Sequence, residues 1–223
     1  MSDSEERGLS HFQLEIASLF FSLPESAGFL LAGGGALIAQ GLVSRETEDL
    51  DFFTQRGGAG VERAAAALIA AAEASGWTTT VIRSGPEFRR IGLTRPDQPS
   101  SEQGTLYIDL AIDAPPDGAP TLTVAGPALS PRELAIRKTL ALFSRAEPRD
   151  FADVYAIHQH FDRSEILTEA AAADAGFDIG VFVQMLRSHK RLCDNDFPPT
   201  GVSVEELRRY FDDWADDLGS DRT

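Results

Sequence analysis

The sequence has a single cysteine, Cys193, and no long apolar run. One cysteine excludes an intramolecular disulfide and a cysteine-rich zinc site. No stretch approaches the ~18 apolar residues that a membrane-spanning helix needs. Residues 2–6 are acidic or polar and lead into no apolar segment typical of a signal peptide. We therefore expect a cytoplasmic protein without a membrane partner.

Positive charge is also scarce, and lysine above all. The 223 residues carry 35 acidic and 20 basic side chains, a formal net charge of −15 at pH 7. The only lysines are Lys138 and Lys190. An acidic surface repels nucleic acids, because basic contacts to phosphate supply most of their non-specific affinity. We therefore expect no DNA partner, and any RNA or nucleotide must meet a local basic patch or a metal ion.

The order of predicted elements indicates a mixed first part and an all-helical second part. In the first part, apolar periodicity predicts helices over 9–22, 36–43 and 62–75 and strands over 29–32, 49–53, 77–83, 87–93, 105–112 and 121–124. A turn-rich loop at 95–104 separates two of the strands. In the second part, we expect helices over 131–146, 148–160, 164–175, 178–192 and 203–218. This order predicts an α+β fold, with a small mixed sheet in residues 1–125 and a C-terminal helical bundle in 126–223.

Three consecutive glycines at 33–35 lie between a predicted strand and a predicted helix. Glycines there let backbone N–H groups approach a phosphate, which the N-terminus of a helix also attracts. No Walker Gly-Lys-Ser/Thr follows, and the spacing of a dinucleotide-binding loop is absent. The segment is equally compatible with a plain tight turn and with phosphate binding by Gly34 and Gly35.

Asp49 and Asp51 alternate with the apolar Leu50, so that both carboxylates share one strand face while Leu50 faces the core. Two like charges so close repel one another unless a cation lies between them, and Mg²⁺ prefers such oxygen ligands. The alternative is a pair of solvated acids at a strand edge. A third carboxylate is available in the strand 105–112, where we favour Asp109 over Asp113 at the strand end.

The predicted helix from residue 131 carries Lys138 and Arg145, seven residues apart and therefore on one face. A compact lysine charge, in a chain that otherwise uses arginine, suits a triphosphate. The alternative is a surface helix with ordinary salt bridges, such as Arg149 with Asp153. The basic segment 187–191 could contact RNA phosphate or be a solvated helix end, and we expect His158 to be a surface residue.

Together these segments resemble the AbiE-type nucleotidyltransferase toxins of the polymerase-beta-like nucleotidyltransferase superfamily. The resemblance covers residues 29–53 and 105–157. It rests on the patterns Gly-Gly-Gly-Ala-Leu, Arg-x-Thr-x-Asp-Leu-Asp-Phe, Ile-Asp-Leu and Arg-Lys-x-x-Ala-Leu-x-x-Arg-x-x-x-Arg-Asp-Phe-x-Asp. The first pattern has a third glycine where the wider superfamily has serine, so that no serine hydroxyl is available for phosphate.

The resemblance implies transfer of NMP from an NTP to an acceptor hydroxyl at the 3′ end of tRNA, by a toxin that has a cognate antitoxin. It implies Mg²⁺ (or Mn²⁺) as cofactor, held by Asp49, Asp51 and Asp109. The implied catalytic residues are Asp49, Asp51, Asp109, Lys138 and Asp150. The implied nucleotide-binding residues are Gly34, Gly35, Thr47, Lys138, Arg145 and Arg149. Further candidates are Arg45, Asp113 and Asp153. Two alternatives stay open: a small-molecule acceptor such as an antibiotic, and a relative that binds nucleotide or a partner without catalysis.

Overall fold

The structure is a computed structural model that describes residues 8–58, 60–96 and 104–220. The chain divides into two compact units, Met1–Gly41 with Glu46–Ser130, and Leu42–Arg45 with Pro131–Thr223. Most of the predicted loop at 95–104 lies outside the described residues. The predicted domain limits, 1–125 and 126–223, stay a prediction.

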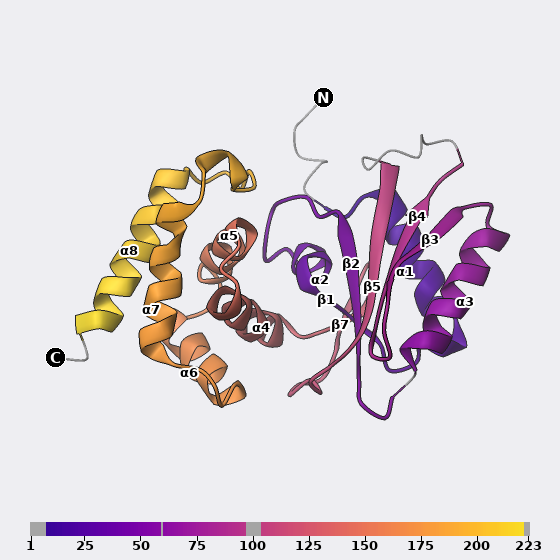
Figure 1. Cartoon of the computed structure of the whole chain (residues 1–223), viewed down its shortest axis with the longest axis horizontal. Coiled ribbons are helices and arrows are strands. Elements are labelled where there is room, and N and C mark those ends of the chain that lie inside the picture. Colours follow the sequence, from indigo (N-terminus) through magenta and orange to yellow (C-terminus); the bar gives the residue numbers. More distant parts are fainter. Residues whose placement is uncertain (1–7, 59, 97–103, 221–223) are drawn as a thin grey trace. The chain divides into compact units, whose positions relative to one another are not determined.

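A mixed sheet forms the centre of the first unit (Figure 1). Within the described residues it has seven strands in the order β3-β4-β5-β2-β1-β7-β6. The strands are β1 (Leu30–Ala32), β2 (Asp49–Gln55), β3 (Thr78–Ser84), β4 (Phe88–Thr94), β5 (Thr105–Asp113), β6 (Thr121–Thr123) and β7 (Gly126–Ala128). The pairs β2–β5 and β1–β7 are parallel, and the other neighbours are antiparallel. Strand β7 was not predicted, because three residues with a central proline carry little strand signal.

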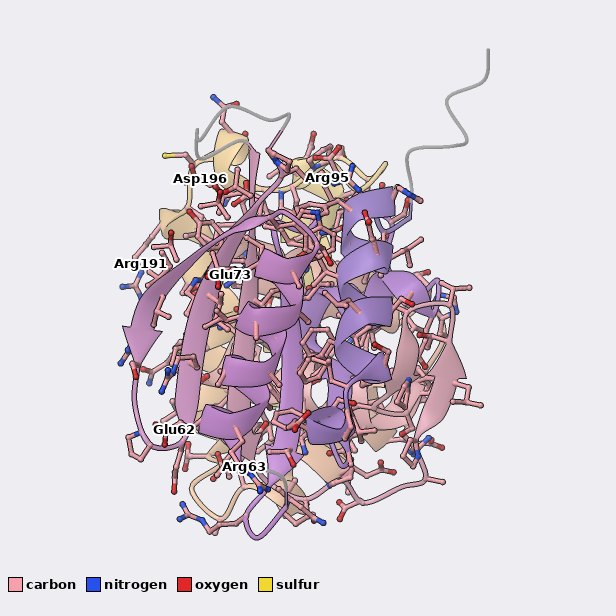
Figure 2. The ribbon with its side chains drawn as sticks, turned by 90° about the vertical axis from the view of Figure 1, so that its right-hand side faces the viewer. Glu62, Arg63, Glu73, Arg95, Arg191 and Asp196 are labelled. Carbon is pink, nitrogen blue, oxygen red and sulfur yellow. The ribbon has the colours of Figure 1, made fainter. Side chains whose placement is uncertain are left out.

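One face of this sheet is apolar and covered by helices. Leu50 and Phe52 of β2 are completely buried. Phe20 of α1 (His11–Ser22) stacks on Phe52, with ring centroids 4.4 Å apart. Helix α3 (Val61–Ala74) lies beside α1 over the same face (Figure 2). The core of this unit therefore lies between the sheet and these two helices, and the odd-numbered residues of β2 belong to the opposite face.

Local sequence signals place the helix ends. Ser10 and Gln13 cap α1 reciprocally: the backbone N–H of Gln13 donates to Ser10 Oγ, and that of Ser10 donates to Gln13 Oε1. After α3, Gly76 adopts a φ of +82°, in the left-handed region that glycine favours. The predicted helices at 9–22 and 62–75 are confirmed to within two residues.

The helix after the glycines differs from its predicted range. Helix α2 spans Gly33–Ala39, so that the glycines form its first turn instead of a separate turn before residue 36. Gly33 has a φ of +57°, which lets the helix begin directly after β1. Gly41, with a φ of +68°, follows the end of the helix. Residues 40–43 therefore lie outside the helix that was predicted over 36–43.

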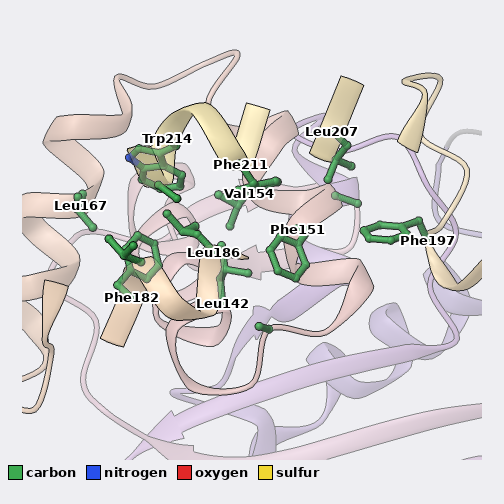
Figure 3. Packing of buried hydrophobic residues seen from close by; sticks show 14 residues of the cluster. Leu142, Phe151, Val154, Leu167, Phe182, Leu186, Phe197, Leu207, Phe211 and Trp214 are labelled. Atoms are coloured by element: carbon green, nitrogen blue, oxygen red, sulfur yellow. The ribbon is translucent and has the colours of Figure 1, made fainter. Parts of the chain in front are cut away.

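The second unit is helical and has its own apolar core. Its helices are α4 (Pro131–Ser144), α5 (Pro148–Ile157), α6 (Arg163–Ala173), α7 (Ile179–Arg187) and α8 (Val204–Ser220). Phe151, Phe182, Phe211 and Trp214 are buried in this core (Figure 3). The rings of Phe151 and Phe211 meet edge to face, with centroids 4.9 Å apart. The predicted α+β fold class is confirmed. In the described part of the chain, no helix has the length and apolar character to span a membrane.

His158 is part of this packing, so its prediction as a surface residue was wrong. Its ring lies edge-on to Trp214, with centroids 4.9 Å apart, and its Nδ1 lies 2.6 Å from Tyr210 Oη. Burial, assisted by the nearby charge of Arg163, lowers the pKa of His158 to about 4. The side chain is therefore neutral in the folded protein at neutral pH.

His158 makes stability depend on pH. Its pKa is about 6.5 in the unfolded chain and about 4 in the folded one. The contribution of neutral His158 to the free energy of unfolding is therefore fully present above pH 6.5 and is lost as pH falls toward 4. Between pH 7 and pH 5 this group should remove about 2 kcal/mol of the free energy of unfolding. Urea denaturation at both pH values should show that His158→Gln abolishes this part of the loss. The exposed His160→Gln is the control, and an unchanged pH dependence in His158→Gln would refute the assignment.

Candidate active site

The three aspartates that the sequence singled out as metal ligands all lie on the polar face of the sheet. In the register of β2 and β5, Asp51 lies opposite Asp109 and Asp49 lies opposite Tyr107. Residues opposite one another on paired strands point to the same face. Asp113 is four residues beyond Asp109, about 13 Å along the strand, and is exposed. The structure therefore places Asp109, and not Asp113, beside Asp51.

The first turn of α2 packs directly against this row. A Cβ atom on Gly33 would lie 1.8 Å from Asp51 Oδ2, and one on Gly35 would lie 2.9 Å from Leu50 Cδ2. A side chain at position 33 would therefore force the Asp51 carboxylate to move. The first N–H groups of a helix have no intrahelical partner. The backbone of Gly34 and Gly35 can therefore offer N–H donors near the carboxylates, as phosphate binding requires.

Thr47 orients the first carboxylate. Its hydroxyl donates a hydrogen bond of 2.8 Å to Asp49 Oδ1. The Gln13 side chain on α1 in turn donates to the Thr47 carbonyl oxygen at 2.7 Å. Thr47 thus acts on Asp49, whereas its predicted contact with nucleotide stays a prediction. Gln13 was not predicted as a site residue. The only sequence feature that pointed to it is its place as a polar residue on the apolar side of a predicted helix.

Asp109 is paired with a residue that the sequence analysis also missed. Arg90 Nη1 lies 3.1 Å from Asp109 Oδ2, and the two residues are opposite one another in the β4–β5 register. Asp109 is 9% exposed. A buried carboxylate is stable only with such compensation. In the sequence, Arg90 alternates with Ile91 and Leu93, both of which are buried. This alternation could have placed Arg90 on the polar face of the sheet.

These residues fit a magnesium ion that arrives with a triphosphate. Asp49 and Asp51 offer carboxylate oxygens on one face, and proteins typically hold Mg²⁺ by one or two carboxylates together with water and substrate phosphates. Within residues 8–58, 60–96 and 104–220, no three His, Cys, Asp or Glu side chains form a ready metal-binding group. The donor set therefore suits an ion whose coordination a phosphate completes.

The second unit contains a buried chain of alternating charges. Arg45 donates to both carboxylate oxygens of Asp153, at 2.7 Å each. Lys138 Nζ lies 2.9 Å from Asp153 Oδ2 and 3.3 Å from Asp150 Oδ1. Arg145 donates to both oxygens of Asp150, at 2.8 and 2.9 Å. We call these five residues the charge network; its three cations and two anions leave a net charge of +1.

The charge network is buried except at Arg145, whose side chain is 43% exposed. The side chains of Asp150 and Asp153 are completely buried, and that of Lys138 is 8% exposed. Burial raises the pKa of Asp150, but the Arg145 hydrogen bonds and the charges of Lys138 and Arg145 outweigh it, so that the pKa lies below its ordinary value. Helix α4 thus differs from the surface helix that the sequence allowed as an alternative. Arg149 pairs with Glu147 at 3.0 Å, and not with Asp153 as that alternative had it.

Two cations of the basic segment at 187–191 pair with acids of α8. Arg187 Nη2 lies 2.8 Å from Asp216 Oδ1, and Lys190 Nζ lies 2.8 Å from Asp212 Oδ1. These ion pairs favour the interpretation of the segment as a solvated helix end over its interpretation as a surface that contacts RNA phosphate.

Similarity to known proteins identifies the family of this chain. Residues 19–223 match the family described as "Nucleotidyl transferase AbiEii toxin, Type IV TA system". The chain belongs to the AbiEii nucleotidyltransferase toxin family. The protein is therefore a nucleotidyltransferase, and its family implies an NTP substrate and a cognate antitoxin. The resemblance stated from the sequence is confirmed.

Solved structures support the AbiEii fold. A candidate nucleotidyltransferase from Helicobacter pylori has a TM-score of 0.57 and 16% identity, over 96% of this chain and 97% of that chain. MenT4, a nucleotidyltransferase toxin from Mycobacterium tuberculosis H37Rv, has a TM-score of 0.50 and 14% identity, over 92% of this chain and 89% of that chain. No curated protein matches the sequence. Identities this low bear on the fold alone.

Gly33→Ala tests the packing of α2 against Asp51 in this AbiEii protein. The substitution adds a Cβ 1.8 Å from Asp51 Oδ2 and forces alanine into a φ of +57°. We expect urea denaturation to show a loss of about 2 kcal/mol or more, because left-handed backbone alone costs about 1–2 kcal/mol. Gly41→Ala is the control, since its φ is +68° and no atom lies within 4 Å of the added Cβ. Equal losses in both variants would contradict the close approach.

Proposed function

We propose that this protein transfers NMP from an NTP to the 3′-terminal hydroxyl of a tRNA, using Mg²⁺ (or Mn²⁺) held by Asp49 and Asp51. The observation that carries the proposal is the row of Asp51 and Asp109 on one face of the sheet, against which the glycine turn of α2 packs. We expect the protein to act in the cytoplasm, where tRNA is present. The cognate antitoxin would be its protein partner.

The proposed reaction is an in-line displacement at the α-phosphorus of the NTP. A bond forms between the acceptor oxygen and phosphorus, and the bond from phosphorus to the pyrophosphate oxygen breaks. When bound, Mg²⁺ supplies Lewis-acid and template chemistry for the triphosphate. The N–H groups of Gly34 and Gly35 bind phosphate oxygens. Asp109, the third carboxylate, accepts the proton of the attacking hydroxyl or helps to hold a second metal ion.

Lys138, with Arg145 and Arg149, is proposed to stabilise the charge that develops on the departing pyrophosphate. Asp150 supports this role because it fixes Lys138 and Arg145 in place.

A small-molecule acceptor is the second candidate, because the formal net charge of −15 disfavours RNA. The deciding experiment incubates the protein and Mg²⁺ or Mn²⁺ with each α-labelled NTP and either total tRNA or aminoglycosides. Label at the 3′ end of tRNA is the expected result. If an aminoglycoside is labelled instead, the acceptor is a small molecule and not RNA. If no product is labelled with any NTP and either metal, the proposal is contradicted.

Asp51→Asn should abolish transfer and leave the protein folded. The substitution removes a charged ligand and relieves repulsion from Asp49, so the melting temperature should stay the same or rise. Asp109→Asn and Asp113→Asn decide between the two candidates for the third acid. We expect the first to lose activity and the second, at the exposed strand end, to keep it. Full activity in Asp51→Asn would refute the metal-site assignment.

Lys138→Arg tests the ammonium group without leaving buried carboxylates uncompensated. The variant keeps the positive charge beside Asp150 and Asp153, whereas a planar guanidinium cannot replace a compact point charge at phosphate. We expect kcat to fall about ten-fold or more, with the KM for NTP changing less. Lys190→Arg, at the only other lysine, is the matched control. Equal kcat values in the two variants would argue against a role for Lys138 in the chemical step.

A further inference from the structure

Two arginines continue the row of aspartates to the edge of the sheet. Arg90 on β4 lies opposite Asp109, and Arg83 on β3, the edge strand, lies opposite Arg90. The row across β3, β4, β5 and β2 therefore runs Arg83, Arg90, Asp109 and Asp51 on one face. Neighbouring strands lie about 4.8 Å apart, so the Cα atoms of Arg83 and Asp51 are about 14 Å apart.

An irregularity in β3 puts Arg83 on this face. Val81 pairs with Ile91, and the next pair along is Arg83 with Arg90, so Ile82 is an extra residue on the edge strand. Without this bulge, Ile82 would lie opposite Arg90, and Arg83 would point to the face that α1 and α3 cover. Bulges occur often next to active sites, where they redirect a side chain. The bulge thus adds a second cation to the aspartate row.

Each of the two arginines lies over an aromatic ring. Arg83 Cζ is 5.5 Å from the ring centroid of Phe88, and Arg90 Cζ is 4.8 Å from that of Tyr107. Both rings are on the polar face, because Phe88 alternates with Arg90 on β4 and Tyr107 with Asp109 on β5. Both rings are partly exposed. We call Arg83, Phe88, Arg90 and Tyr107 the arginine–aromatic strip.

The chemistry of the strip suits a single-stranded nucleic acid. Bases of any sequence stack on aromatic faces while cations contact the backbone phosphates. Arg90 forms an ion pair with Asp109. Arg83 has no carboxylate partner in the part of the chain that the structure describes. We therefore expect Arg83 to make the main contact with phosphate. In the other basic cluster, at 187–191, Arg187 and Lys190 are already paired with acids of α8.

We infer that the arginine–aromatic strip binds the single-stranded 3′ end of an RNA acceptor and guides its terminal hydroxyl to Asp51 and Asp109. This inference rests on the proposed nucleotidyl transfer and adds to it the surface and the strandedness of the acceptor. Phe88 and Tyr107 stack bases, Arg83 contacts a phosphate, and the RNA enters across the β3 edge.

The test measures binding of a fluorescein-labelled single-stranded RNA with a free 3′-hydroxyl by fluorescence anisotropy, at several salt concentrations. Arg83→Ala should weaken binding and reduce the slope of log Kd against log salt by about 0.7, the value for one phosphate contact on a single strand. Phe88→Leu/Tyr107→Leu keeps apolar bulk but removes the rings. This double variant should raise Kd about ten-fold or more while the salt slope stays the same. A blunt duplex of the same sequence should bind more weakly and respond less to the ring substitutions.

Arg63→Ala is the matched control, because Arg63 is an exposed arginine on α3, over the opposite face of the sheet (Figure 2). An unchanged Kd and slope in Arg83→Ala, or an equal change in Arg63→Ala, would overturn the inference. Transfer of labelled NMP by the unaltered protein is measured in parallel. If RNA is labelled while the strip variants bind like the unaltered protein, the inference fails and the proposed function stands. If no acceptor is labelled but RNA binding depends on the strip, the proposed function fails instead.

Discussion

The parallel pairing of β2 with β5 is the constraint on which the candidate active site depends. Its register sets Asp51 opposite Asp109 and Asp49 opposite Tyr107. A shift of one residue would turn these acids toward the apolar core, because side chains alternate between the two faces. The buried Leu50 and Phe52 prevent such a shift, because both belong to the apolar face, where Phe52 stacks on Phe20 of α1. The apolar core thus determines where the carboxylates lie.

Charge compensation is the second constraint, and each unit meets it in its own way. On the sheet, Arg90 compensates Asp109. In the helical unit, the charge network surrounds two completely buried carboxylates with three cations. Removing one partner of a buried pair costs about 3–5 kcal/mol, because the other charge is left uncompensated. The network therefore contributes to the fold of this unit besides the role proposed for Lys138.

Much of the fold could be predicted because its signals are local. Alternation around Leu50 placed Asp49 and Asp51 on one face, and apolar periodicity placed α1 and α3 to within two residues. Features that depend on register or tertiary contact could not be predicted. The space that Gly33 leaves for Asp51, the Arg90 partner of Asp109 and the bulge at Ile82 exist only once strands pair. The pairing of Arg45 with Asp153 joins residues 108 positions apart. Burial of His158 likewise depends on the packing of α8.

The proposed function depends above all on Asp49 and Asp51 holding the metal ion of a bound nucleoside triphosphate. A crystal structure with Mn²⁺ and an NTP analogue that cannot be cleaved between its α- and β-phosphates tests it directly. We expect an anomalous peak for Mn²⁺ in contact with both carboxylates, and triphosphate oxygens at the N–H groups of Gly34 and Gly35. A nucleotide bound with its metal ion away from Asp49 and Asp51 would contradict it.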